Sequence, residues 1–490
     1  MSHTNQSYRD FAKSRSQTNP CLTGLVEHLG RGAENTSTIV TLDYPQDGQL
    51  TPNPFLVTEV DLAELLAATS AIYGRVLLVE NIRPSLVSLL GEILGLDPIF
   101  FAGHITTNFD DIEKAPPPPS LALFPSQIAE RGYLHLHFQQ VLDLGTSDAL
   151  KYSTYALKTD SNIPRNVRRL PCLSGRQLAL ARACCSVVVK NIKGSWICLI
   201  LVDPPAKTVI ETLKPGGRKR YPSKPLHGGS EDFAQPTSFE SFRSATGSHP
   251  WNKNSMLNSL LHYFSNQPPG FTVTQPSILS LGYYPMRIFL AEWVTYIHLL
   301  SRYFKYYEYS LHDIQHRLHD SDIVDLQRWR RRSMQSQQKL RFLAMFIDYW
   351  SQKETNKQPW DMVQKDISHV LSQLEHYSRS LEQMIPVATS MAQILDSQRA
   401  MLQTANVSRL TFIALVFVPL SWVASLFSMS GEYAPGHRQF WVYIATALPV
   451  LFVVLLLPAL QWAKVAEKLK ELGICLTRRA GKQKTGAEFA

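Results

Sequence analysis

Hydrophobic and polar positions follow three different spacings along this chain of 490 residues. Between about residues 37 and 206, short apolar runs such as RVLLVENI and SWICLILVD are typical of strands, and PSLVSLLGEILGL has the spacing of an amphipathic helix. After Pro285 the spacing is helical, and near the C-terminus two stretches contain no charge at all. The pattern predicts an α+β fold class, with an α/β domain followed by a long helical stalk and two C-terminal transmembrane helices.

The two uncharged stretches run from Leu410 to Phe427 and from Phe440 to Trp462. At about 1.5 Å per residue, each helix would cross most or all of a hydrocarbon core of about 30 Å. For the first stretch alone, a buried globular helix is the alternative. The second has aromatic residues near both ends, including Trp441, as is typical of the membrane interface. We therefore predict a two-helix transmembrane domain over 410–462, with spans at 410–427 and 440–462.

The chain is moderately basic, with 49 Lys and Arg against 40 Asp and Glu. This balance fits either a nucleic-acid binder or a membrane protein with a cationic inner face. Seven Lys and Arg residues follow the second stretch, from Lys464 to Lys484, whereas the loop between the stretches has only Arg438. The positive-inside bias then predicts that both termini are cytosolic. We expect no nucleic-acid partner, and the plasma membrane as location, with an organellar membrane as the alternative.

Amino-acid composition helps to place the predicted domain boundaries in the rest of the chain. Residues 207–276 are rich in Gly, Pro and Ser, and the six cysteines form no regular framework, which indicates a reducing compartment. The predicted boundaries are a disordered N-terminus at 1–36, a cytosolic α/β domain at 37–206, a low-order linker or insertion at 207–276, a helical stalk at 277–409, the transmembrane domain at 410–462 and a basic cytosolic tail at 463–490.

No catalytic motif stands in the context that its chemistry requires, so we predict no enzyme and no cofactor. His135 and His137 share one face of the predicted strand YLHLHFQQVLDL, a possible spacing for metal ligands. A third ligand at a suitable spacing is missing, so ordinary cross-strand packing is favoured. Asp203, which precedes two prolines, is interpreted as a strand terminator.

The third helix of the stalk has a seven-residue apolar repeat sustained over six heptads. Such a repeat predicts packing of the coiled-coil type along the helix. Pro386 should kink or break it. The first positions of the repeat are Ile367, Leu374, Leu381, Ala388, Leu395 and Leu402, and the second are Val370, Tyr377, Met384, Met391, Gln398 and Ala405.

On the opposite face, a line of small, polar or modest-sized residues without charge continues from the stalk into the first apolar stretch. A polar line that enters a bilayer has to face water, a pore or another helix. We interpret it as pore-lining, and a face of small residues for helix packing is the alternative. We call this line the stripe; it comprises Ser390, Gln393, Ser397, Ala400, Thr404, Val407, Thr411, Ala414, Val418, Ser421, Ser425 and Ser428.

The segment RLTFIALVFVPLSWVASLFSMSGEYAPG, at 409–436, resembles the CorA family of magnesium, cobalt and zinc transporters. In that family a stalk helix becomes the first span, carries a Pro-Leu-Thr/Ser step and ends at Gly-Met-Asn. Pro419, Leu420 and Ser421 match the step, and Met429 matches the centre of the tripeptide. Further upstream, LLVENIRP and LGLDPIFFAGHI resemble the divergent eukaryotic branch of the family.

The resemblance implies a homopentamer in a lipid bilayer that conducts a divalent cation, Mg²⁺ with Zn²⁺ or Co²⁺ as alternatives. It aligns Ser428, Met429 and Ser430 with the selectivity tripeptide. Deeper pore positions would be Ser421, Val418 and Val407, and Gln393 stands where the family often has an acidic gate residue. Glu432 in the outer loop would attract cations. The alternative function is a non-conducting scaffold or regulator that retains the fold.

Overall fold

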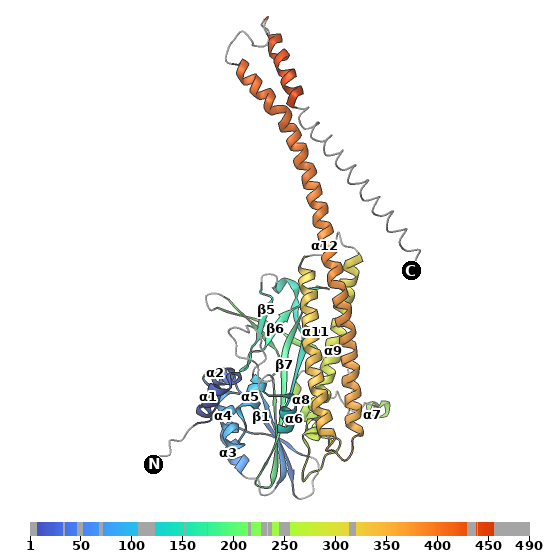
Figure 1. Ribbon diagram of the computed structural model, residues 1–490. Helices are drawn as coiled ribbons and strands as arrows, with labels where there is room; N and C mark the ends of the chain where they lie inside the picture. Colours follow the sequence, from blue (N-terminus) through green and yellow to red (C-terminus); the bar gives the residue numbers. More distant parts are fainter. Residues whose placement is uncertain are drawn as a thin grey trace, which may run out of the picture. The chain divides into compact units, whose positions relative to one another are not determined.

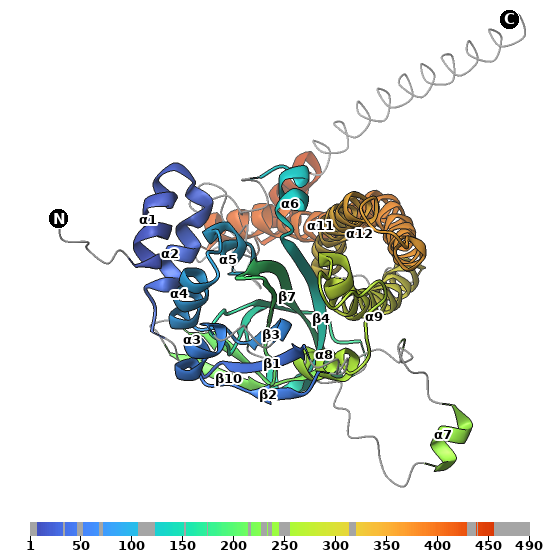
Figure 2. The same cartoon turned by 90° about the horizontal axis from the view of Figure 1, so that it is seen from below.

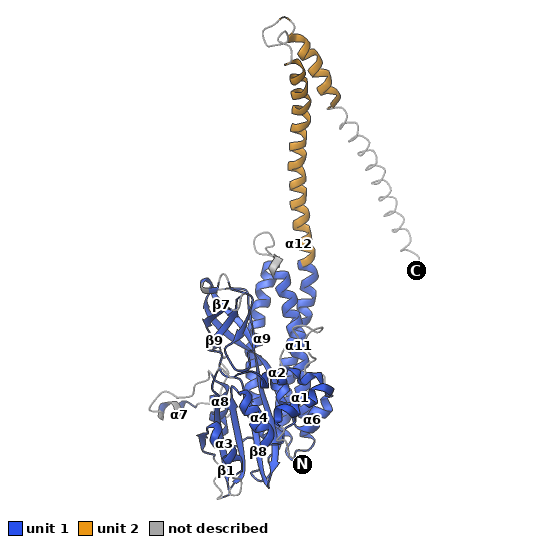
Figure 3. Cartoon of the chain, turned by 90° about the vertical axis from the view of Figure 1, so that its left-hand side faces the viewer, with its two compact units in different colours: residues 1–388 blue, residues 389–490 orange. Residues whose placement is uncertain are grey.

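The computed structural model describes residues 7–32, 35–46, 52–67, 72–105, 123–150, 153–173, 175–213, 217–226, 233, 238–244, 255–312, 320–428, 438 and 440–454. The chain forms two compact units, residues 1–388 and residues 389–490 (Figure 3).

An eleven-stranded mixed sheet forms the centre of the first unit (Figure 1). Its main path runs in the order β10-β9-β5-β6-β7-β8-β3-β1-β2, and β4 pairs with both β7 and β11. Strands β3 and β8 are parallel, and the other pairs are antiparallel. The strands are β1 Thr38–Pro45, β2 Pro54–Leu56, β3 Ile72–Glu80, β4 Leu134–Thr146, β5 Ala156–Thr159, β6 Asn166–Arg169, β7 Arg176–Ile192, β8 Ser195–Val202, β9 Thr208–Thr212, β10 Arg218–Pro222 and β11 Lys224–Leu226.

Strand β8 is buried at every position, which explains why its sequence is a continuous apolar run and does not alternate. A two-residue turn at Lys193 and Gly194 joins it to β7, and both turn residues have positive φ, 50° and 89°. That turn geometry matches the twist of an antiparallel hairpin. The strands predicted from RVLLVENI, ACCSVVVKNI and SWICLILVD are therefore confirmed as β3, β7 and β8.

One face of the sheet is covered by short helices, among them α1, α2, α4 and α5 (Figure 2). Side chains such as Leu25, Leu86 and Phe100 form a single buried cluster with Leu77 and Leu199 of the sheet. The N-terminal helices are α1 Tyr8–Thr18, α2 Thr23–Leu29, α3 Glu59–Ala67, α4 Pro84–Ile93, α5 Pro98–Ile105 and α6 Pro125–Arg131, with short 3₁₀ helices at Pro20–Leu22 and Ser147–Leu150.

Three long helices and α8 pack on the other face, where they share a core with the opposite side of the same strands. The rings of Phe304 and Tyr377 lie 5.6 Å apart between α9 and α12, and Gln337 of α11 donates to the carbonyl of Leu374 in α12 at 3.3 Å. Figure 2 shows α9, α11 and α12 side by side as a bundle. The helices of this part are α7 Phe239–Ser244, α8 Met256–Phe264, α9 Ile278–His312, α11 Asp320–Ser351 and α12 Gln358–Phe427.

The heptad repeat of α12 has two environments. In the first unit Ile367, Leu374 and Leu381 are fully buried against the bundle of their own chain. In the second unit Leu402 is 68% exposed. The helix also continues through Pro386, so the expected break is absent. The first half of the predicted seam is therefore packed within one chain, and from Gln398 onward its positions are exposed in a single chain.

The prediction of a disordered N-terminus at 1–36 is wrong over α1 and α2. Ser7 and Asp10 cap α1 reciprocally, with the Ser7 N–H donating to the Asp10 carboxylate at 3.2 Å. Leu22 and Leu25 are fully buried in the core between the sheet and the helices that cover it. The polar composition of this segment concealed the few apolar residues that dock it.

Low order was also predicted for 207–276, but strands β9, β10 and β11 and helix α8 lie within that range. Val209 is fully buried, and the Tyr221 hydroxyl donates to the Glu211 carboxylate at 2.8 Å. These strands are three to five residues long, and the positions of β10 are mostly exposed. The apolar signal is too short in such strands for the sequence pattern to detect it.

In the second unit, the end of α12 packs on an apolar helix at Phe440–Val454. Among the described residues, α12 is the helix that is long and apolar enough to cross a membrane, and Phe440–Val454 is shorter. The rest of the predicted second span, up to Trp462, lies outside the described residues. One candidate span is therefore present in the structure, and the second stays a prediction.

Candidate functional site

The stripe lies on the part of α12 that belongs to the second unit, beginning at residue 390. Helical spacing brings its positions to one face because they recur every three or four residues. Nine residues of the stripe were predicted to line the pore, and all nine are exposed: Gln393, Thr404, Val407, Thr411, Ala414, Val418, Ser421, Ser425 and Ser428.

The opposite face of α12 is the one that contacts the helix Phe440–Val454. Val423 is 3% exposed, and the rings of Phe427 and Tyr443 meet edge-on at 5.9 Å. Since successive residues of a helix turn by about 100°, Ser421 and Ser425 each lie about 160° around the axis from Val423. The stripe therefore points away from the second helix of its own chain.

Hydroxyl groups on the stripe donate their protons to the helix itself. Thr404 Oγ1 donates to the Ala400 carbonyl at 2.7 Å, Thr411 Oγ1 to Val407 at 2.8 Å, and Ser421 Oγ to Val418 at 2.9 Å. A hydroxyl has one proton and two acceptor lone pairs. Once the proton is used in this way, the oxygen remains free to accept hydrogen bonds or to face a cation.

At the end of α12 the structure describes only part of the predicted selectivity tripeptide. Ser428 directly follows the helix, and its N–H donates to the Ala424 carbonyl at 3.0 Å. Met429, Ser430 and Glu432 lie outside the described residues, so their roles stay predictions. Pro419 lies within α12 and has no N–H, which deprives the Leu415 carbonyl of its usual helical donor.

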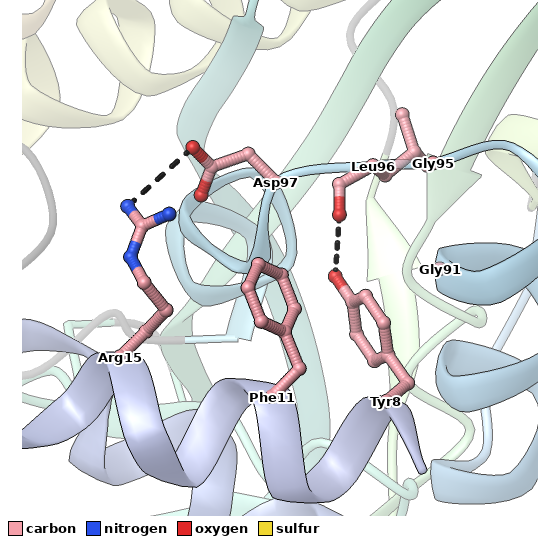
Figure 4. A pocket seen from close by; sticks show the side chains of 7 residues that line it. All are labelled: Tyr8, Phe11, Arg15, Gly91, Gly95, Leu96 and Asp97. Carbon is pink, nitrogen blue, oxygen red and sulfur yellow. Dashed lines mark hydrogen bonds and ion pairs between the residues drawn. The ribbon is translucent and has the colours of Figure 1, made fainter. Parts of the chain in front are cut away.

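The first unit also has a pocket of about 390 Å³ between α1 and the segment from α4 to α5 (Figure 4). Its polar groups are already paired: the Tyr8 hydroxyl donates to the Leu96 carbonyl at 2.8 Å, and Asp97 forms ion pairs with Arg15 at 3.7 Å and Arg131 at 3.0 Å. The Tyr8 hydroxyl and the Asp97 carboxylate in this pocket are therefore already engaged.

His135 and His137 lie on β4, as predicted, but their surroundings are more polar than ordinary cross-strand packing suggests. Both are partly buried, and the ring of His135 contacts Phe100 of α5 at 5.4 Å between centroids. Sequence reasoning missed their partners His104, Cys184 and Ser186. The signal was the polar alternation in YLHLHF opposite ACCS on the paired strand. Among the described residues, no group of three His, Cys, Asp or Glu could hold a metal ion.

Asp203 directly follows the end of β8 at Val202, as a strand terminator should, and also has a structural role. Its carboxylate accepts two hydrogen bonds of 2.8 Å from the guanidinium of Arg165 and one of 2.8 Å from the backbone N–H of Cys184. Arg165 is 1% exposed. The Asp203 carboxylate therefore neutralises a cation that would otherwise be buried without a counter-charge.

Residues 281–464 match the family described as CorA-like Mg²⁺ transporter protein. The match spans most of α9, all of α11 and α12, and the described helix after them, and it confirms the resemblance seen at 409–436. A comparison with curated protein sequences gave no match.

Solved structures that resemble this chain include the following two. The CorA magnesium transporter from Methanocaldococcus jannaschii is 9% identical, with 86% of this chain and 98% of that chain covered and a TM-score of 0.36. The full-length CmaX protein is 14% identical, with 87% and 98% covered and a TM-score of 0.34.

Proposed function

We propose that this protein is a membrane channel or transporter for divalent metal cations, with the stripe of α12 lining the cation pathway. One observation carries the proposal: an uncharged polar line continues through an apolar helix and points away from the only described neighbouring helix of the second unit. The CorA-like sequence of residues 281–464 supports the same function, since that family is described by magnesium transport.

The chemistry of the stripe suits a hydrated cation. A small divalent ion such as Mg²⁺ holds its water tightly, so a pathway for it needs acceptor oxygens that bind those water molecules. Thr411 and Ser421 present such oxygens because their protons are bonded to the helix. Each chain supplies only one line of oxygens, so a closed pathway needs several copies around an axis. We propose a homopentamer, the number that the family resemblance implies.

The outer end of the pathway is where this chain departs from its relatives. Ser428, Met429 and Ser430 align with Gly-Met-Asn, so a hydroxyl replaces the longer amide acceptor. We propose that these residues form the filter, with Glu432 concentrating cations before it. The transported ion is Mg²⁺, Zn²⁺ or Co²⁺. Both termini face the cytosol, and the plasma membrane is the favoured location, because the basic residues follow the second stretch.

Cysteine accessibility tests the pathway directly. In liposomes containing the purified full chain, Ser421→Cys should react with a water-soluble, charged thiol reagent because the stripe borders water. Phe412→Cys is the matched control: Phe412 is 60% exposed in the single chain but lies about 180° around the helix from Ser421, where lipid or another helix would shield it. The native cysteines all lie outside 410–462.

Modification of Ser421→Cys should also reduce divalent-cation flux, because the added charge stands in the pathway. If both variants react equally, or if neither reacts, the stripe does not line a water-filled pathway. Failure of Ser421→Cys to react would favour the non-conducting scaffold, in which the stripe is a dry packing face.

A further inference from the structure

Three histidines lie together in the first unit on the sheet face that α5 covers. His104 belongs to α5 and is 1% exposed, and His135 and His137 belong to β4. The backbone makes room for them: a Cβ at Gly103 would come within 2.6 Å of His135 Nε2, so only glycine lets the ring approach. We call His104, His135 and His137 the histidine cluster.

A single hydroxyl links two members of the cluster. Ser186 Oγ lies 2.9 Å from His104 Nδ1 and 2.8 Å from His135 Nδ1, and Ser186 is fully buried. Because the hydroxyl has one proton and two lone pairs, it can donate to one imidazole and accept from the other, or accept from both and donate to Cys184 Sγ at 3.5 Å. The Ser186 hydroxyl therefore holds the two neutral rings together.

The same geometry gives an added proton on His104 no close acceptor. If the added proton makes His104 an imidazolium, its Nδ1–H donates to Ser186 Oγ, and the Ser186 hydroxyl donates to His135. His104 Nε2 has no hydrogen-bond partner among the described residues, but it lies 3.9 Å from the Asp203 carboxylate. That carboxylate already accepts from Arg165 and from the backbone N–H of Cys184, so a new Nε2–H would meet no acceptor within hydrogen-bond distance among the described residues.

Charged and titratable groups surround the cluster on every side. Burial is the main cause that lowers the pKa of His104 and His137, and neighbouring cations lower both further, Arg165 first for His104 and Lys339 of α11 first for His137. Burial lowers the pKa of His135 to about 4. The groups facing the cluster are Arg165 and Asp203 beside His104, Arg182, Cys184 and Lys339 beside His137, and His28 of α2.

We propose that the histidine cluster is a proton-binding site that makes the packing of α5 and α11 on the sheet responsive to acid. At neutral pH the three rings are neutral, and they bridge α5 to β4 and β7. On acidification a charge on His104 faces a carboxylate that Arg165 already occupies, and a charge on His137 meets the cation of Lys339 on α11. The sheet then loosens from α5 and α11. The inference does not depend on cation conduction.

The direction of the pH effect follows from the pKa values. The histidine pKa values of the folded cluster lie below the ordinary value of about 6.5. The open form, in which α5 and α11 have separated from the sheet and the histidines are solvated, therefore binds more protons. The stability of the packed form falls as pH drops below about 6.5. For His135, with a folded pKa of about 4, opening becomes about tenfold more favourable at pH 5.5 than at pH 8. The loss of stability due to His135 levels off below about pH 4. Lys339, with a pKa lowered to about 8 mainly by burial, is already charged below pH 7 and keeps its charge through this window.

Hydrogen–deuterium exchange of the full chain in detergent, read by mass spectrometry and corrected for intrinsic exchange rates, tests the proposal. Peptides covering α5 and β4 should lose protection by about tenfold or more between pH 7.5 and pH 5.5. His104→Asn should reduce this loss, because an asparagine side chain can bond Ser186 from the position of Nδ1 but does not titrate. His376→Asn, at an exposed histidine of α12, should leave the loss unchanged.

If His104→Asn does not fold, His135→Asn provides the same comparison, because it too removes a titrating ring and leaves a side chain that can bond Ser186. Equal protection at the two pH values in the unmodified chain would overturn the proposal. So would an undiminished loss in every cluster variant that folds, because the titrating groups would then lie elsewhere. A flux assay does not enter this test, so failure of the channel proposal would leave its result valid.

Discussion

Single polar residues inside the first unit depend on partners that are distant in the sequence. Arg165 and Asp203 are 38 positions apart, and their bidentate pair forms only when β6 and β8 lie in one sheet. The sequence correctly predicts that a strand ends at Asp203, because two prolines follow it. The ion pair cannot be recognised from the sequence, because the order of strands in the sheet, and not local spacing, decides which residue meets Asp203.

Replacing Asp203 with asparagine tests how much the first unit depends on this pair. Asp203→Asn leaves the guanidinium of Arg165 buried without its counter-charge, a change that typically costs about 3–5 kcal/mol. We expect a clearly lower thermal unfolding midpoint for the full chain in detergent. Asp396→Asn is the control, because the Asp396–Arg399 pair on α12 is largely exposed on both sides and should contribute little. Similar midpoints for the two variants would show that the pair does not stabilise the fold.

At the scale of elements, long periodic segments were predicted well and short ones were not. The helical spacing after Pro285 corresponds to α9, α11 and α12, and the apolar runs correspond to the central strands. Strands β9 to β11 and helices α1 and α2 were missed because each buries only a few side chains. The heptad repeat predicted packing along α12 but could not show that the buried half packs within the same chain, since coiled coils and intramolecular bundles have the same spacing.

The two halves of that repeat should respond differently to the same substitution. Leu374→Asp places a charge in the packed bundle, where Leu374 is fully buried, and should cost at least about 3 kcal/mol and lower the thermal unfolding midpoint of the full chain. Leu402→Asp falls on the exposed half and should leave that midpoint nearly unchanged. Instead it should reduce the mass of the detergent-solubilised particle from five chains toward one.

The mass of the particle also tests whether the exposed half of the α12 repeat forms a subunit interface. A five-chain particle that persists in Leu402→Asp would mean that the exposed half of the repeat is not a subunit interface. A native particle of one or two chains would contradict the pentamer itself. If Leu374→Asp unfolds at the native midpoint, the packed half of the repeat contributes less than its burial indicates.

For the molecule as a whole, the sequence and the structure support different parts of the proposed function. The apolar stretch at 410–427 and the match over 281–464 indicate a membrane protein of the CorA-like type. The structure adds that the polar stripe faces away from the helix Phe440–Val454 and that its hydroxyl protons are bonded to α12. A sequence cannot supply these facts, because they depend on which face of α12 the second helix covers.

The most direct test of the central claim is divalent-cation flux through the purified full chain in liposomes with an inside-negative potential. We expect uptake of at least one of Mg²⁺, Co²⁺ and Zn²⁺ above that of empty liposomes, and its loss in Ser421→Leu, which replaces an exposed acceptor oxygen by an apolar side chain. Ser421→Thr retains the hydroxyl and should retain flux. Absence of uptake for all three ions by a correctly assembled protein, or equal uptake by the native chain and Ser421→Leu, would contradict a cation pathway along the stripe of α12.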